Sequence, residues 1–348
     1  MSHERKNFVE LALEETFTPE EKEQKELWSK HLYGVGGLCA EAWLGLFLIR
    51  LPNLRILEFQ HENSELISDI LLKAAKRQQP FHQTPPFPHL QEIRACVGWG
   101  ASWIDSDFLN PFFYFPDVRK IYGTAIGEKN EKAVVVRENL PKKCPVQTVI
   151  VEEGYWCRGM LNWLGLCTDL QHICITIEIQ ADEYELDEED QFDASEFRLA
   201  LLPFTTTLRT IRIRYADSYK DHVIDEKEDI EVPFGSFKDF IFLETLTVRH
   251  DHLMKLRDDS TIDWHMHTLT EILPHCLLNL EIIDVMVDYH LQLSSELLKI
   301  LRPGRCPINL QRLKLCIGLA DSDELGDMFR DLELECQAAN VYLEIETS

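Results

Sequence analysis

A six-residue pattern that recurs nine times constrains this chain more than any other feature. Each copy has apolar residues at positions one, four and six, with variable residues between them. One such hexamer carries no information, but nine in one chain indicate a repeat architecture in which each unit buries its apolar side against its neighbours. The copies begin at Leu54, Leu90, Val118, Val146, Leu170, Leu208, Leu243, Leu280 and Leu310.

Proline lies just before five of these hexamers, at Pro52, Pro88, Pro116, Pro145 and Pro307. Because proline cannot donate a hydrogen bond to a strand ladder, it suits the entry to a strand rather than its interior. Successive hexamers begin 24 to 38 residues apart, whereas ordinary leucine-rich repeats are about 20–29 residues long. The sequence therefore predicts an α/β fold, a leucine-rich-repeat solenoid with a curved parallel β-sheet, irregular repeats, and helices and loops outside.

The predicted domains are a helical N-terminal cap, residues 1–42, and a leucine-rich-repeat domain, residues 43–348. Within the cap, Thr18-Pro-Glu-Glu21 has the residues of a capping box and predicts a helix that runs to about Tyr33. A second helix is expected from Leu38 to Ile49, because the residue before Pro52 is driven out of the α region.

The spacers between hexamers divide into helices and acidic loops. Helical spacing of apolar residues predicts helices at 64–76 and 294–301, and a last helix that carries Leu325, Met328, Phe329 and Leu332. A final strand is expected at 341–345. The acidic stretches 181–196 and 221–231 lack apolar periodicity, and we expect loops there, either solvated or docking a basic partner.

Charge and motifs exclude several classes of function. The chain has 60 acidic and 35 basic residues, a net charge of −25, which repels phosphate backbones and anionic lipid, so we expect neither nucleic acid nor membrane as a partner. Ten cysteines without a Cys-x-x-Cys pair, and no secretory signal, favour a cytoplasmic or nuclear protein. No phosphate loop, nucleophile elbow or zincin motif is present, so we expect no enzyme and no cofactor.

Two His-x-His pairs are the nearest approach to a metal site. His250 and His252, and His265 and His267, would each present two imidazoles on one side of an extended segment. The alternative is that they are loop histidines at the end of a strand. Because no further ligands complete either pair, we expect no metal.

The chain resembles the leucine-rich-repeat portion of fungal F-box and F-box-like proteins. The match lies in 51–57, in 235–240 running into 242–248, and in 272–280, within about residues 43 to 348. The resemblance implies that this protein is a substrate receptor of a ubiquitin ligase. Its curved sheet would recognise the substrate protein. Residues 1–42 lack the Leu-Pro-Glu-Ile-like start of an F-box, so the resemblance does not extend to the segment that would bind the SCF adaptor, and the ligase role is in doubt. The Asn or Cys that usually follows each strand is replaced in seven copies, which predicts irregular turns.

Protein binding is expected on the concave face of the sheet, where position five and its outward neighbours point. The candidate residues are Arg94, Tyr122, Ile150, His172, Arg212, Arg214, Arg249 and Lys314. We hypothesise that this face binds an acidic or phosphorylated segment of another protein. On this hypothesis, Arg212→Glu with Arg249→Glu should abolish partner capture and leave thermal stability nearly unchanged.

Three alternatives stay open from the sequence. The arginines could instead pair with Glu58, Glu244 and Asp284 on neighbouring strands and only offset repulsion. The protein could be an intracellular leucine-rich-repeat scaffold unrelated to ubiquitin. A metal-binding or enzymatic protein is the third class, and only the histidine pairs favour it.

Overall fold

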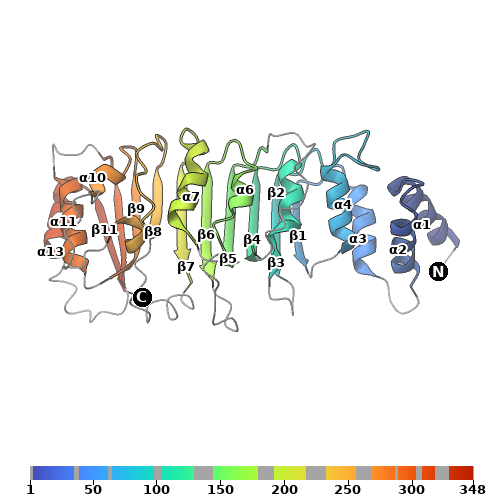
Figure 1. Ribbon diagram of the computed structural model, residues 1–348, viewed down its shortest axis with the longest axis horizontal. Coiled ribbons are helices and arrows are strands. Elements are labelled where there is room, and N and C mark those ends of the chain that lie inside the picture. Colours follow the sequence, from blue (N-terminus) through green and yellow to red (C-terminus); the bar gives the residue numbers. More distant parts are fainter. Residues whose placement is uncertain are drawn as a thin grey trace. The chain divides into compact units, whose positions relative to one another are not determined.

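The computed structural model describes residues 3–34, 39–61, 65–97, 103–128, 144–178, 192–216, 233–255, 268–286, 289–302, 308–317 and 329–347 (Figure 1). The chain divides into two compact units, which are described separately. Unit 1 comprises Met1–Val146 with Leu166–Thr168, and unit 2 comprises Gln147–Gly165 with Asp169–Ser348.

Unit 1 begins with helices and continues into a small parallel sheet in the order β1-β2-β4, with β3 beside β4. Its elements are α1 (His3–Thr16), α2 (Lys22–Tyr33), α3 (Ala40–Ile49), β1 (Ile56–His61), α4 (Glu65–Ala75), β2 (Glu92–Val97), β3 (Ile104–Asp105), α5 (Ser106–Leu109), the 3₁₀ helix η1 (Asn110–Tyr114) and β4 (Lys120–Gly127).

The N-terminal helices differ in detail from the prediction. Helix α2 starts at Lys22 rather than just after Thr18, although the Glu21 carboxylate still accepts a hydrogen bond from the Thr18 backbone N–H at 2.8 Å. The sequence signal thus located the capping contact but placed the helix start too early. The predicted boundary between residues 42 and 43 falls inside α3.

Gly45 of α3 packs closely against Trp28 of α2. A Cβ there would lie 2.4 Å from the buried Trp28 ring. Although alanine is favoured over glycine in a helix by about 1 kcal/mol, we expect Gly45→Ala to destabilise unit 1 by about 1–3 kcal/mol, because the rigid ring must move. Urea unfolding, monitored by hydrogen exchange of the α2 and α3 amides, measures this.

A matched control for that substitution is Gly165→Ala, where a Cβ would make only ordinary 3.6 Å contacts. We expect its urea midpoint to equal that of the wild-type protein. Equal midpoints for Gly45→Ala and Gly165→Ala would contradict the close packing of α3 on α2.

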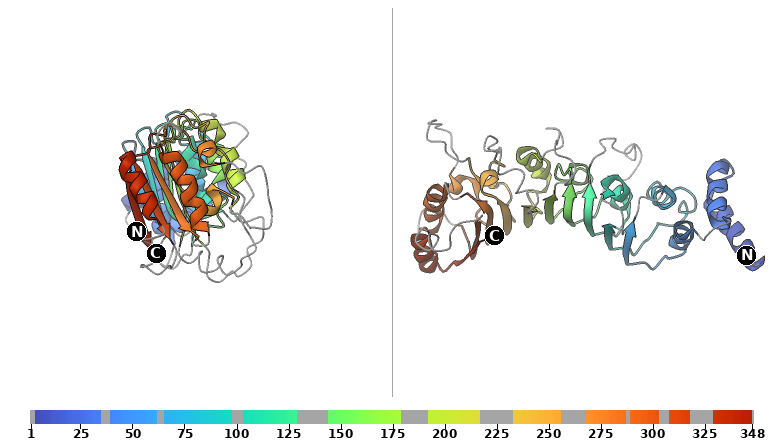
Figure 2. Two further views of the ribbon diagram at one scale, coloured as in Figure 1. Left: turned by 90° about the vertical axis from the view of Figure 1, so that its left-hand side faces the viewer. Right: turned by 90° about the horizontal axis from the view of Figure 1, so that it is seen from below.

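Unit 2 is a parallel sheet whose strands pair in chain order from β5 to β11. Its helices lie on one face of that sheet (Figures 1 and 2). The elements are β5 (Thr148–Tyr155), α6 (Leu161–Leu164), β6 (His172–Glu178), α7 (Ala194–Leu201), the 3₁₀ helix η3 (Leu202–Phe204), β7 (Thr210–Tyr215), β8 (Thr245–Arg249), α9 (His250–Leu253), α10 (Leu269–Ile272), β9 (Asn279–Val285), α11 (His290–Leu301), β10 (Arg312–Ile317), α13 (Arg330–Ala339) and β11 (Tyr342–Thr347).

Strand register follows the fourth position of the hexamers. In unit 2 the residues paired across successive strands are Val149, Ile173, Ile211, Leu246, Leu280, Leu313 and Leu343. In unit 1 they are Leu57, Ile93 and Ile121. Most of these side chains are fully buried against the helix side. The α/β class and the parallel pairing predicted from the hexamers are therefore confirmed.

One hexamer was placed three residues too late. Leu246, at position four of its hexamer, pairs with Leu280 on β9. The hexamer on β9 therefore begins at Leu277 and not at Leu280. Position five on β9 is consequently Glu281 rather than Asp284. Asp284 instead has a φ of +51° where the β9–β10 register shifts, the geometry of a bulge.

The spacers differ from the prediction at several points. The acidic loop expected at 181–196 is wrong at its end, because Asp193 caps α7 by accepting a hydrogen bond from the Glu196 N–H at 2.9 Å. Residues 181–191 and 221–231 lie outside the described residues, as do Leu325 and Met328. Helix α11 begins at His290, before the predicted 294.

Within the described ranges, no helix has the length and apolarity needed to span a bilayer.

Candidate binding surface

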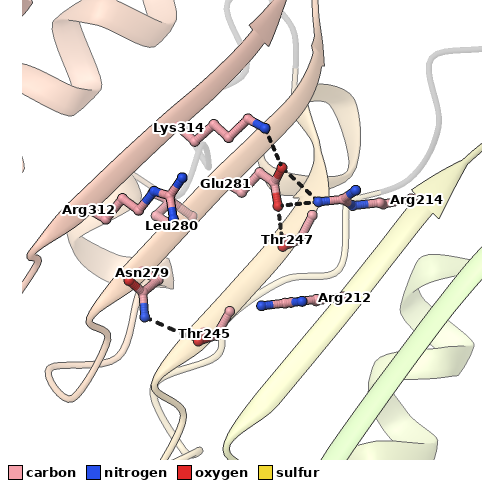
Figure 3. Close-up of a pocket in the computed structure, with 9 residues that line it drawn as sticks. All are labelled: Arg212, Arg214, Thr245, Thr247, Asn279, Leu280, Glu281, Arg312 and Lys314. Carbon is pink, nitrogen blue, oxygen red and sulfur yellow. Dashed lines mark hydrogen bonds and ion pairs between the residues drawn. The ribbon is translucent and has the colours of Figure 1, made fainter. Parts of the chain in front are cut away.

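The candidate surface is the face of the unit 2 sheet opposite its helices, called here the open face. Position-five residues align across it in register: Ile150, Cys174, Arg212, Thr247, Glu281, Lys314 and Glu344. A hollow of about 280 Å³ lies over β7 to β10 (Figure 3). It is lined by Arg212, Arg214, Thr245, Thr247, Asn279, Leu280, Glu281, Arg312 and Lys314.

Glu281 is the acidic residue that lines the hollow, and its carboxylate contacts residues from three neighbouring strands. Arg214 reaches across β8 and donates hydrogen bonds to both Glu281 carboxylate oxygens, at 2.9 and 2.8 Å. Thr247 Oγ1 donates to the same carboxylate at 2.9 Å, and Lys314 Nζ lies 3.6 Å away. Burial by itself would raise the pKa of Glu281, but these donors and charges lower it below its ordinary value. Glu281 is therefore ionised at neutral pH.

The cations of β10 are matched by carboxylates on β11. Lys314 Nζ lies 2.6 Å from Glu346 and 3.7 Å from Glu344, while Arg312 forms an ion pair with Glu344. The hydrogen bond to Glu346 raises the pKa of Lys314, although burial opposes it. These two cations are thus largely satisfied within the sheet.

Arg212 differs from its neighbours. Its side chain is exposed, and it has neither an ion pair nor a hydrogen bond to any residue that the structure describes. The residues paired with it are Cys174 and Thr247, which carry no charge at neutral pH. Arg212 therefore offers its guanidinium donors to a ligand without first breaking an ion pair.

Uncharged hydrogen-bonding groups surround Arg212. Asn279 Nδ2 donates to Thr245 Oγ1 at 3.3 Å, and His172 Nδ1 lies 3.0 Å from Thr210 Oγ1. Burial, together with the charge of Arg209, lowers the pKa of His172, so its imidazole is neutral at pH 7. The hollow thus combines one available guanidinium with hydroxyl and amide groups, a set that suits an oxyanion.

The predicted candidates divide between the two units. Arg94 and Tyr122 belong to unit 1, where Arg94 lies 3.6 Å from Glu58 and 2.9 Å from Glu92. Ile150 and His172, both half-buried, lie on the open face of unit 2 with Arg212, Arg214 and Lys314. Cross-strand ion pairing, the alternative considered for these cations, is present for Arg94, Arg214 and Lys314.

Arg249 was wrongly placed on the exposed surface. Its side chain is only 5% exposed and lies 3.0 Å from Asp251 and 3.5 Å from Asp284. Its guanidinium also stacks over the Tyr215 ring at 4.8 Å. Strand β8 ends at Arg249 and α9 begins at the next residue, so the alternation of a strand no longer predicts where this side chain points. Arg249 is part of a buried charge cluster and is not part of the candidate surface.

The first histidine pair is also not arranged as predicted. His250 and His252 lie on the helical turn α9 and are buried, and His252 packs against the rings of Phe192, Tyr215 and Phe234. His265 and His267 lie outside the described residues. Within the described part of the chain, no group of three or more His, Cys, Asp or Glu side chains could hold a metal ion.

Six of the nine residues that line the hollow are not among the predicted candidates: Thr245, Thr247, Asn279, Leu280, Glu281 and Arg312. Glu281 was missed because the hexamer on β9 was read in the wrong register. The signal that identifies it is Leu277, which starts an equally good apolar pattern three residues earlier. The threonines and Asn279 occupy the outward positions three and five but carry no charge, so nothing in their chemistry drew attention.

Comparisons with known proteins give no functional assignment. No family model and no curated protein matches the chain. A crystal structure of a Bacteroides fragilis protein, solved by the Northeast Structural Genomics Consortium, is similar over 94% of this chain and 82% of that one. The sequence identity is 13% and the TM-score 0.35. At that score the likeness carries no argument about fold or function.

Proposed function

We propose that this protein is a non-catalytic recognition module of the leucine-rich-repeat type, which binds another protein through the open face of unit 2. The proposal includes the F-box-like resemblance, under which the bound protein would be a ubiquitin-ligase substrate. The observation that carries it is Arg212, an exposed guanidinium with no ion pair among the described residues, at the edge of a hollow whose other cations are matched.

The chemistry of the hollow favours an anionic group on the partner. A carboxylate or phosphate would accept hydrogen bonds from Arg212 and from the Thr245 hydroxyl, whereas the Thr247 hydroxyl already donates to Glu281. Glu281, held ionised by Arg214 and Lys314, would repel the same anion from the far side of the hollow. One localised anionic side chain next to Arg212 therefore fits better than a long acidic run that covers the whole hollow.

Three synthetic peptide pools test this proposal. Each has random flanking positions around one fixed residue, which is phosphothreonine, glutamate or threonine. We expect the immobilised protein to retain the phosphothreonine or the glutamate pool over the threonine pool. Arg212→Glu should weaken this retention about tenfold or more, because it removes the donor and adds a like charge.

The matched control is Arg55→Glu, which makes the same change in net charge at an exposed residue of unit 1. It should leave retention unchanged, and both variants should unfold at the wild-type urea concentration. Equal retention by wild-type protein and by the Arg212→Glu variant would contradict the open face as the binding surface.

A further inference from the structure

Strand β11 lies at one edge of the unit 2 sheet in the part of the chain that the structure describes. Among the described residues, β11 pairs only with β10. The Tyr342 N–H donates to the Gln311 carbonyl at 2.8 Å, which turns the backbone groups of Tyr342, Glu344 and Glu346 toward β10. Because backbone groups alternate along a strand, those of Leu343, Ile345 and Thr347 point away from the sheet. An edge of this kind is a template for another strand.

The side chains of this edge are incompletely covered. On the helix side of the sheet, Ile345 is 38% exposed and Leu343 is half-buried, whereas their equivalents Leu315 and Leu313 on β10 are fully buried. A further strand that brought apolar residues beside Leu343 and Ile345 would remove this surface from water.

Charge on the open face specifies what that strand should carry. Strand β9 contributes the negative Glu281, β10 contributes the positive Arg312 and Lys314, and β11 ends the series with the negative Glu344 and Glu346. Glu346 is 56% exposed. Since opposite charges on adjacent strands attract and like charges repel, the next strand in the series is favoured when it is positive.

We propose that an extended segment of a partner protein, in which basic and apolar residues alternate, adds to β11 as a further strand of the unit 2 sheet. Its apolar side chains would cover Leu343 and Ile345, and its basic side chains would lie beside Glu344 and Glu346. Its backbone would pair with the outward groups of β11, the mode known as β-augmentation. A second copy of this chain fits poorly, because pairing two β11 strands would place four glutamates together on one face.

The test uses a blocked peptide of sequence Lys-Val-Lys-Val-Lys-Val and a charge-reversed control, Glu-Val-Glu-Val-Glu-Val. Fluorescence anisotropy should show binding of the lysine peptide and not of the glutamate peptide. Ile345→Pro removes an outward N–H but no hydrogen bond to β10, and it should weaken binding about tenfold or more. Equal binding by the two peptides, no binding by the lysine peptide, or unchanged binding to the proline variant would overturn the proposal.

Amide hydrogen exchange in the wild-type protein provides a readout that does not depend on how the proline variant folds. The Leu343 and Ile345 amides should exchange quickly in the free protein and slowly with the lysine peptide bound. The Glu344 amide, which faces β10, should be protected in both states. Unchanged exchange at Leu343 and Ile345 under saturating peptide would also overturn the proposal.

Discussion

Replacing Arg249 with methionine is expected to lower the free energy of unfolding of unit 2 by about 3–5 kcal/mol, the usual cost of removing one partner from a buried ion pair. Arg249 is the cation that faces both Asp251 and Asp284, and all three side chains are at most 10% exposed. Burial already raises the pKa of Asp251, and the charge of Arg249 opposes that rise. Without it, two buried carboxylates repel each other. Urea unfolding, monitored by hydrogen exchange of the β8 and β9 amides, measures the loss of free energy of unfolding.

Two further variants separate the buried cluster from a general effect of losing an arginine. Arg209→Met removes an exposed cation that pairs with Glu244 at 2.6 Å, and we expect it to cost less than about 1 kcal/mol. Adding Asp251→Asn and Asp284→Asn to Arg249→Met should restore part of the lost stability. If Arg249→Met costs no more than Arg209→Met, the cluster does not stabilise unit 2.

Acidification should destabilise unit 2 through His250. This imidazole is fully buried, and burial lowers its pKa from 6.5 to about 4. Below about pH 6.5 the unfolded chain binds a proton at His250 that the folded chain does not accept. The free energy of unfolding therefore falls as the pH drops from 6.5 to about 4, by on the order of 3 kcal/mol from this residue. The lowered pKa of His252 acts in the same direction.

His250→Asn isolates this contribution. Its side-chain oxygen can replace Nδ1, which accepts a hydrogen bond from the Met286 N–H at 3.4 Å, but it cannot be protonated in this range. The raised pKa of Asp251 acts against the histidines, because the folded state gains stability from that group as the pH falls. Comparing urea unfolding of the two proteins at pH 7.5 and 4.5 cancels the groups that they share. The same loss on acidification in both proteins would show that His250 does not contribute.

The hexamers predicted the parallel pairing well because positions four and six point to the same side of a strand, so a slip of one residue would expose both. They failed on β9, where Leu277, Leu280 and Ile282 overlap with Leu280, Ile283 and Val285 in an equally apolar pattern. Only pairing with Leu246 and Leu313 decides between the two. A single strand cannot carry that information, because the choice depends on its neighbours.

The candidate surface was predictable where strands are regular and not where they end. Arg212, Arg214 and Lys314 lie on the open face because they alternate with buried residues inside β7 and β10. Arg249 follows the same alternation, but the chain turns into α9 directly after it. Asp284 then approaches it from the bulge in β9. The sequence contains all three charged residues of this cluster but nothing that shows they meet.

Arginine side-chain NMR of the complex with a peptide selected from the retained pool tests most directly whether the open face binds a partner. We predict that the Arg212 Nε–Hε signal and the methyl signals of Thr245 and Thr247 shift when the peptide is added. An unchanged Arg212 signal under saturating peptide, with the shifts confined to residues away from the hollow, would contradict the proposed function.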